Sequence, residues 1–234
     1  MPSRKVTMSI AAVAAALAVG GGSYAIASAA SGSAPASAPP SASSPASGPR
    51  TSGGASNARS GPAAGGTEGT VSSVSPSGFT LTTSAGQKVT ITEAPATTYQ
   101  EGTSPASANA VATGETVLVL GTTENTAIAA TQVIVHPATP AAATAAQVVP
   151  FKRGTASTSK QAGQIPASYS QGSGTIVSGT AAGKATEAAL GAYPGGIVDR
   201  VVQLSNGEYE VHNIGVNWPH HVFVNQDFKV VGAD

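Results

Sequence analysis

The chain has 234 residues, of which only 9% are charged and 4% are aromatic, and its formal net charge is zero. Cysteine is absent, which excludes a disulfide framework, a thiolate metal site and a cysteine nucleophile. Acidic residues outnumber basic ones in 67–136 and 181–234, which argues against a nucleic-acid partner because phosphate binding needs clustered Lys and Arg. Only these two pieces hold enough apolar residues for a core, and each is too small to enclose a deep pocket.

Residues 1–30 predict an export signal. Two basic residues, Arg4 and Lys5, precede an uncharged and mostly apolar run, and small residues in A-x-A patterns follow at 25–29. An uncleaved signal anchor is the alternative, because the uncharged run is long enough to span a bilayer. With positive charge on the N-terminal flank alone, either outcome places residues 31–234 outside the cytoplasm, secreted or anchored to the cell membrane by the N-terminal segment.

Two linkers are expected. Residues 31–66 are almost all Ser, Ala, Gly or Pro, and without apolar bulk they predict a disordered stalk. Residues 137–179 begin with Pro-Ala-Thr-Pro and predict a second, less uniform flexible linker. Within it, 148–151 and 165–169 could dock on a module, and 175–177 could add an edge strand to the C-terminal sheet.

Strand and turn signals recur in residues 67–136. Period-two alternation and Ser/Gly turns predict five strands at 69–74, 79–83, 88–92, 116–120 and 128–135, with an irregular insertion around Pro95 and Pro105. This pattern fits a small closed or half-closed barrel of OB-like type. With G-T-V-S-S-V, G-F-T-L-T and G-E-T-V-L-V-L-G at its strands, the module resembles a domain of unknown function common in exported bacterial proteins, and that resemblance implies no assigned chemistry.

Residues 180–234 predict one helix followed by strands. Thr180 is the expected N-cap, alanines fall on one helical face, and Pro194-Gly195-Gly196 ends the helix. Alternation and the tight Asn206-Gly207 turn predict strands at 197–204, 209–216, 222–225 and 228–231. A helix packed on an antiparallel meander, beside the barrel-like module and its disordered linkers, gives an α+β fold class.

The C-terminal run also carries a family resemblance. Three runs cover nearly all of 180–232: K-A-T-E-A-A-L-G-A-Y-P-G-G-I-V-D-R-V, N-G-E-Y-E-V-H and H-V-F-V-N-Q-D-F-K-V-V-G. They resemble the PepSY domain (peptidase propeptide and YpeB-like) in its small actinobacterial form. The resemblance implies an extracytoplasmic module associated with protease propeptides and with the regulation of peptidases near the cell surface, without catalytic residues. The chain departs from the family pattern at 213–221, where the usual polar turn is replaced.

Candidate contact residues gather in this module. Adjacent His220 and His221 should point to opposite faces, and His212 should lie several residues away from them along the hairpin. Together with Glu210, these histidines suggest a metal site, but no ligand spacing such as H-E-x-x-H supports one. We favour histidines that are solvated or hydrogen-bonded. Trp218 either caps the core, which we favour, or anchors a partner. The candidate partner contacts are Trp218, His220, His221, Tyr209, Glu210 and His212.

No catalytic motif such as G-x-S-x-G or S-x-x-K is present, so we expect a non-enzymatic protein without a cofactor or metal. The leading hypothesis is an exported envelope protein whose PepSY-like module binds or regulates a peptide or peptidase partner. The first alternative is a structural or ligand-binding envelope protein in which the β module recognises the ligand. The second is a metal-binding protein that uses the C-terminal histidines.

Overall fold

The computed structural model describes residues 61–136, 147–156 and 159–234. The expected export signal lies outside these residues, as do most of the expected stalk and part of the second expected linker. Among the described residues, no helix is long and apolar enough to cross a membrane.

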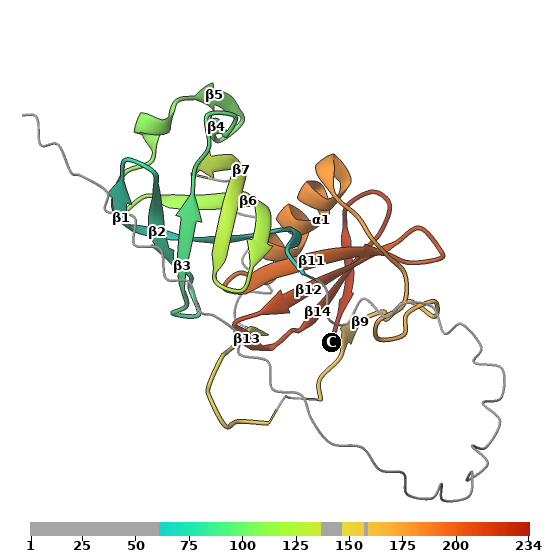
Figure 1. Ribbon diagram of the computed structural model, residues 1–234. Helices are drawn as coiled ribbons and strands as arrows, with labels where there is room; N and C mark the ends of the chain where they lie inside the picture. The colour runs from blue at the N-terminus through green and yellow to red at the C-terminus, as the bar shows by residue number, and fades with distance from the viewer. Residues whose placement is uncertain (1–60, 137–146, 157–158) are drawn as a thin grey trace, which may run out of the picture. The chain divides into compact units, whose positions relative to one another are not determined.

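The elements of these ranges are predominantly β (Figure 1). The strands of the first half are β1 (Ala63–Ser75), β2 (Gly78–Thr82), β3 (Lys88–Thr92), β4 (Thr98–Glu101), β5 (Ser104–Ala106), β6 (Thr116–Glu124) and β7 (Ala127–Val135), with a short 3-10 helix at Ala108–Ala110. The second half contains β8 (Val149–Pro150), β9 (Ala162–Gly163), β10 (Thr175–Ile176), α1 (Gly179–Ala192), β11 (Ile197–Gln203), β12 (Tyr209–Ile214), β13 (Val216–Trp218), β14 (His221–Val224) and β15 (Val230–Ala233).

Five strands close into a barrel, as the sequence predicts. β1 pairs antiparallel with β2 and β6, β2 with β3, and β6 with β7, while a parallel β3–β7 pair completes the circle. Because side chains alternate along a strand, Val71, Leu81 and Val89 all point inward and are at most 1% exposed. The barrel core is therefore aliphatic.

The insertion between β3 and β6 is more regular than expected. β4 runs parallel to β7, and β5 forms a hairpin with β4. Thr97 fixes the entry to β4, because its hydroxyl accepts the Ala94 N–H at 2.9 Å and donates to the Ala130 carbonyl at 2.8 Å. The prediction of an irregular stretch is wrong here, since the partner of β4 lies more than thirty residues further along the chain and leaves no local periodic signal.

The C-terminal half is a sheet covered by one helix, which agrees with the α+β class. β11, β12, β14 and β15 pair antiparallel in that order. Helix α1 packs its alanine face on this sheet through Ala185, Ala189 and Leu190, all of them fully buried. Lys184 and Glu187 on the opposite face are exposed, as the helical pattern predicts.

The start of α1 differs from the prediction. Ser178, not Thr180, is the N-cap residue, and its side chain makes no capping hydrogen bond. The reason is tertiary: the Val177 N–H bonds to the Val201 carbonyl in the sheet, so the chain must turn sharply before the helix. Gly179 makes that turn at φ +71°, a conformation that favours glycine.

The expected flexible linker at 137–179 is not confirmed for the residues that the structure describes. β8 pairs with β13 and β9 pairs with β15. β10 pairs with the edge of β11, which confirms the edge strand expected at 175–177. Val148 and Val149 pack against the core of the C-terminal half, which confirms the docking expected for this part of the segment.

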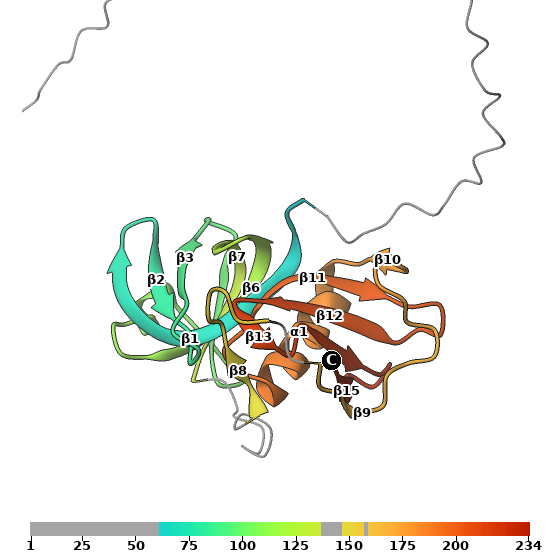
Figure 2. The ribbon, with the colours of Figure 1, turned by 90° about the horizontal axis from the view of Figure 1, so that it is seen from below.

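The barrel and the C-terminal half meet at β1 (Figure 2). Gly66 and Thr67 of β1 pair with Val198 and Ile197 of β11. Both expected cores are present, but each takes residues from the other half: Leu118, Leu120 and Ile134 join the helix core, and Ile197 joins the barrel core. A Cβ at Gly65 would overlap the Val198 backbone carbonyl, so this junction requires glycine.

Candidate functional site

Trp218 is buried rather than offered to a partner. Its side chain is 0% exposed, its ring packs edge-on against Tyr193 with ring centres 5.4 Å apart, and its indole N–H donates to the Lys160 carbonyl at 2.7 Å. The favoured reading of a cap over the core is confirmed. The burial does not support the alternative in which Trp218 anchors a partner, because the chain around Lys160 covers the ring.

Tyr209 and Glu210 are also deeply buried. Tyr209 is 8% exposed and stacks on Phe228, with ring centres 5.6 Å apart. Glu210 is 1% exposed although it lies on the sheet face opposite to α1. This burial does not support the prediction that either side chain contacts a partner directly, and that role stays a prediction.

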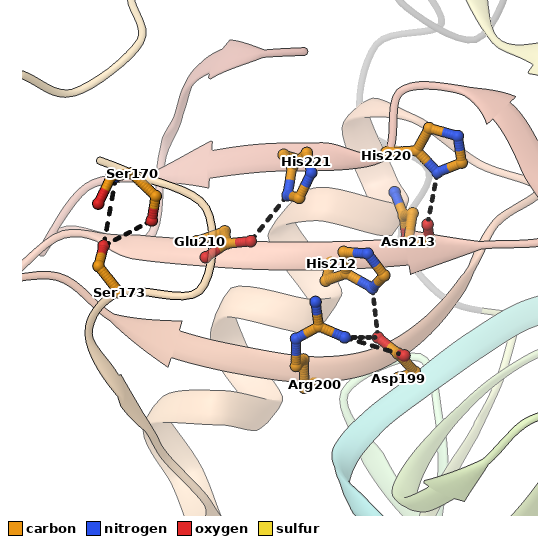
Figure 3. A network of polar contacts seen from close by, with 9 residues as sticks. All are labelled: Ser170, Ser173, Asp199, Arg200, Glu210, His212, Asn213, His220 and His221. Carbon is orange, nitrogen blue, oxygen red and sulfur yellow. Dashed lines mark hydrogen bonds and ion pairs between the residues drawn. The ribbon is translucent and has the colours of Figure 1, made fainter. Parts of the chain in front are cut away.

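The histidines are arranged differently from the expectation. His212 of β12 and His221 of β14 are direct cross-strand partners, and their ring centres lie 5.1 Å apart. Figure 3 shows the two rings on the same side of the sheet. His220 turns elsewhere, with Nδ1 3.2 Å from the Asn213 backbone oxygen. The expected separation of His212 from His221 is wrong because the excursion through β13 brings β14 back directly beside β12.

Each of these two histidines is held by a carboxylate. His212 Nδ1 lies 2.6 Å from Asp199 Oδ1, and His221 Nδ1 lies 2.7 Å from Glu210 Oε1. Arg200 binds the same Asp199 carboxylate at 3.2 Å. We call His212, His221, Asp199, Glu210 and Arg200 the outer-face network. It contains two carboxylate–imidazole pairs side by side.

The segment before α1 covers this network. The Tyr169 ring packs edge-on against Phe223, with ring centres 4.8 Å apart, and lies 5.5 Å from the His221 ring. Burial, reinforced by the negative charge of Glu210 and Asp234 and opposed by Arg200, raises the pKa of Tyr169 to about 12. Docking of 165–169 on the C-terminal module is thus confirmed for Tyr169. Beside it, the Ser173 hydroxyl donates to the Ser170 carbonyl at 2.6 Å (Figure 3).

Two buried polar atoms of this face, Glu210 Oε2 and Arg200 Nε, have no hydrogen-bond partner within the described part of the chain. Both polar side-chain atoms of Asn213, on the opposite face of β12, are also buried without a partner. Buried polar groups are normally paired, and an unpaired one costs about 1 to 3 kcal/mol. In the described ranges, no group of three or more His, Cys, Asp or Glu side chains is placed to hold a metal ion.

A separate groove runs between α1 and the outer surface of the barrel. Its larger part has a volume of about 740 Å³ and is lined by β1, β6, β7 and the chain that leads into α1. A second part of about 370 Å³ continues toward the β4–β5 hairpin. The two parts share Leu120, Gln132, Thr180 and Gly183. We call these two adjacent hollows together the α1 groove.

The lining of the α1 groove is mostly small or neutral. Small residues line much of the groove: Ala63, Ala64, Gly65, Gly121, Gly179 and Gly183. The neutral side chains with hydrogen-bonding groups include Thr98, Gln100, Thr122, Thr131 and Gln132. Among the lining residues, Lys184 and Glu187 carry the charges, and both lie in the second part. Sequence reasoning missed this groove because its walls come from segments that are remote along the chain.

Comparison of the chain with models of protein families, with curated proteins and with solved structures found no match. Function is therefore inferred from the α1 groove and the outer-face network.

Proposed function

We propose that this protein is a non-catalytic protein of the cell envelope that binds an extended peptide segment, free or exposed on a peptidase partner, in the α1 groove. The observation that carries the proposal is that two adjacent hollows, which share four lining residues, are built jointly by the barrel strands and by α1. Ligand sites often lie where two structural units meet. Peptide recognition would therefore need both the barrel and the C-terminal half. This combines recognition by the PepSY-like module with recognition by the β module.

The chemistry of the groove favours a peptide as its occupant. Gln100 and Gln132 offer uncharged amide donors and acceptors of the kind that pair with a peptide backbone. The hydroxyls of Thr98 and Thr131 donate to the Thr131 and Leu120 carbonyls and so add acceptors alone. Small residues such as Gly183 let a chain approach closely, because a Cβ built there would meet only the Leu120 side chain at 3.5 Å. Nucleic acid would instead require a cluster of basic side chains.

The family resemblances and the location belong to the same proposal. The order β1-β2-β3-β7-β6 around the barrel supports an OB-like type, and the succession of β11, β12, β14 and β15 supports the meander of a PepSY-like module. The basic and apolar start of the chain supports export. N-terminal sequencing of the protein from culture supernatant and membrane fractions tests the location, and recovery from the cytoplasm alone would contradict it.

The binding function is tested by selecting random ten-residue peptides from a display library against the immobilised full-length protein. We expect selected peptides to bind the wild type and to lose at least tenfold in affinity for Gly183→Leu. Leucine is a good helix former, so this variant fills the groove without opposing α1. The same full-length protein is then added to secreted peptidases, and we expect slower hydrolysis of casein.

The matched control is Ala129→Leu, which adds bulk to an exposed position of β7 outside the lining of the groove. It should bind the selected peptides like the wild type. Equal losses in both variants, or failure to select any peptide that competes for one site, would overturn the groove as the binding site. Peptide binding without any effect on casein hydrolysis would overturn the peptidase part alone.

A further inference from the structure

We propose that His212 and His221 form a binding site for one divalent transition-metal ion, with the Nε2 atom of each ring as ligand. The proposal does not depend on peptide binding in the α1 groove, which involves neither histidine. It rests on the cross-strand pairing of the two residues, on the carboxylates that hold their rings and on the buried, unpaired Oε2 atom of Glu210.

The spacing of the rings suits a shared ion. His212 and His221 lie opposite each other on adjacent antiparallel strands, and their ring centres are 5.1 Å apart. Zinc lies about 2.1 Å from a ligating imidazole nitrogen, so two rings on one tetrahedral ion have their centres about 5 Å apart. Two protein nitrogens leave the remaining coordination positions to water, which agrees with the lack of a third protein ligand in the described ranges.

The carboxylates prepare both rings for this role. A metal-binding histidine usually donates its second ring N–H to a carboxylate, which fixes the tautomer and orients the ring. Asp199 and Glu210 take that position here, at 2.6 and 2.7 Å from the Nδ1 atoms of His212 and His221. Asp199 lies on β11, across β12 from β14. His212 Nδ1 therefore bonds on the side of β12 away from β14, and the Nε2 atom of His212 is not used by any of these contacts.

Charge and access also favour a cation. Asp199 and Glu210 carry two negative charges, and Arg200, which is bound to Asp199, carries one positive charge. Glu210 Oε2 is buried and unpaired, and a buried carboxylate without a cationic partner is costly. The side chains of His212 and His221 remain 18% and 12% exposed, so a small ion can reach them from solvent.

The test uses the full-length protein without an affinity tag, because the chain has only four histidines. Their imidazole proton signals are followed by NMR while NiCl2 is added. We expect the signals of His212 and His221 to broaden together at substoichiometric Ni²⁺, before those of His136 and His220. Equal broadening of all four, or no broadening in metal excess, would overturn the site.

Calorimetric titration with ZnCl2 then assigns the ligands. His212→Ala and His221→Ala should each lower the affinity at least tenfold. Glu210→Gln should lower it about tenfold to a hundredfold, because the carboxylate that orients the His221 ring is lost. His220→Ala and His136→Ala are the matched controls and should leave it unchanged. Loss of affinity in either control would contradict the assignment. The NMR titration needs no variant, so it stays decisive if a substitution in the network impairs folding.

Discussion

The barrel interior and the outer face of the C-terminal sheet are both removed from water, but by different means. The barrel encloses aliphatic side chains such as Leu81 and Val119, which are 0% exposed. The outer face instead buries Glu210 and Arg200 under Tyr169. Aliphatic packing tolerates many arrangements of similar volume, whereas buried charges require particular partners. The barrel interior therefore depends on apolar packing, whereas the outer face depends on particular carboxylate–imidazole pairs.

The largest effect should come from removing the aromatic cap of the C-terminal half. We expect Trp218→Ala to lower the free energy of unfolding by about 3 to 5 kcal/mol, measured by urea denaturation. Leu81→Ala in the barrel should cost about 2 to 5 kcal/mol. Because the two cores share residues across the β1–β11 junction, both variants should shift one common transition. Two separate transitions would show that the halves are stabilised independently.

An intermediate effect is expected from breaking one pair of the outer-face network. His221→Ala leaves the buried Glu210 carboxylate without its partner, and we expect a loss of about 2 to 3 kcal/mol in the free energy of unfolding. Replacing both residues by leucine should recover most of this loss, because no unpaired charge then remains. Equal destabilisation by the single and double variants in urea denaturation would indicate that packing, not charge, governs this face.

The smallest effect should be confined to alkaline pH and compares the two regions directly. Burial raises the pKa of Tyr169 to about 12, and in the barrel burial and the hydrogen bond to Glu93 raise the pKa of Tyr99 to about 12, both from 10.0. The folded state keeps these protons when the unfolded state has lost them. Stability should therefore be unaffected below pH 10 and should fall between about pH 10 and 12.

Absorbance titration of the phenolates checks this expectation. Tyr99→Phe and Tyr169→Phe should each remove one late-titrating phenol, and each should weaken the alkaline loss of stability. If Tyr169→Phe alone changed the profile, the pKa of Tyr99 would not be raised and the two regions would differ in this respect as well.

The local sequence pattern predicted the positions of strands and the helix better than it predicted which strands pair with each other. Alternation located the five barrel strands, and the alanine face of α1 indicated the side that packs on the sheet. The same reasoning missed β4 and β5, placed the N-cap at Thr180 and treated 137–179 as a flexible linker apart from the docking and the edge strand expected within it. In each case the deciding contact is with a strand distant in sequence, such as β7 for β4 or β15 for β9.

The candidate sites were less accessible to sequence than the fold. The histidines and Glu210 stand out as a group of polar residues, but the sequence suggested that His212 lies apart from His221. Only the return of β14 beside β12 makes them neighbours. The α1 groove left no motif at all, because small residues such as Gly183 and Gly121 are ordinary in this composition and form a wall only when the barrel meets the helix.

The sequence by itself determined where the five barrel strands, the body of the helix and the main C-terminal strands lie, because side-chain period and turn chemistry act over a few residues. The tertiary structure decided which strands pair, that the two halves share β1, and which polar side chains face each other. Those outcomes depend on burial and on pairing between distant segments, where a one-residue change of register would turn every side chain to the opposite face. The groove and the histidine pair both arise at that level.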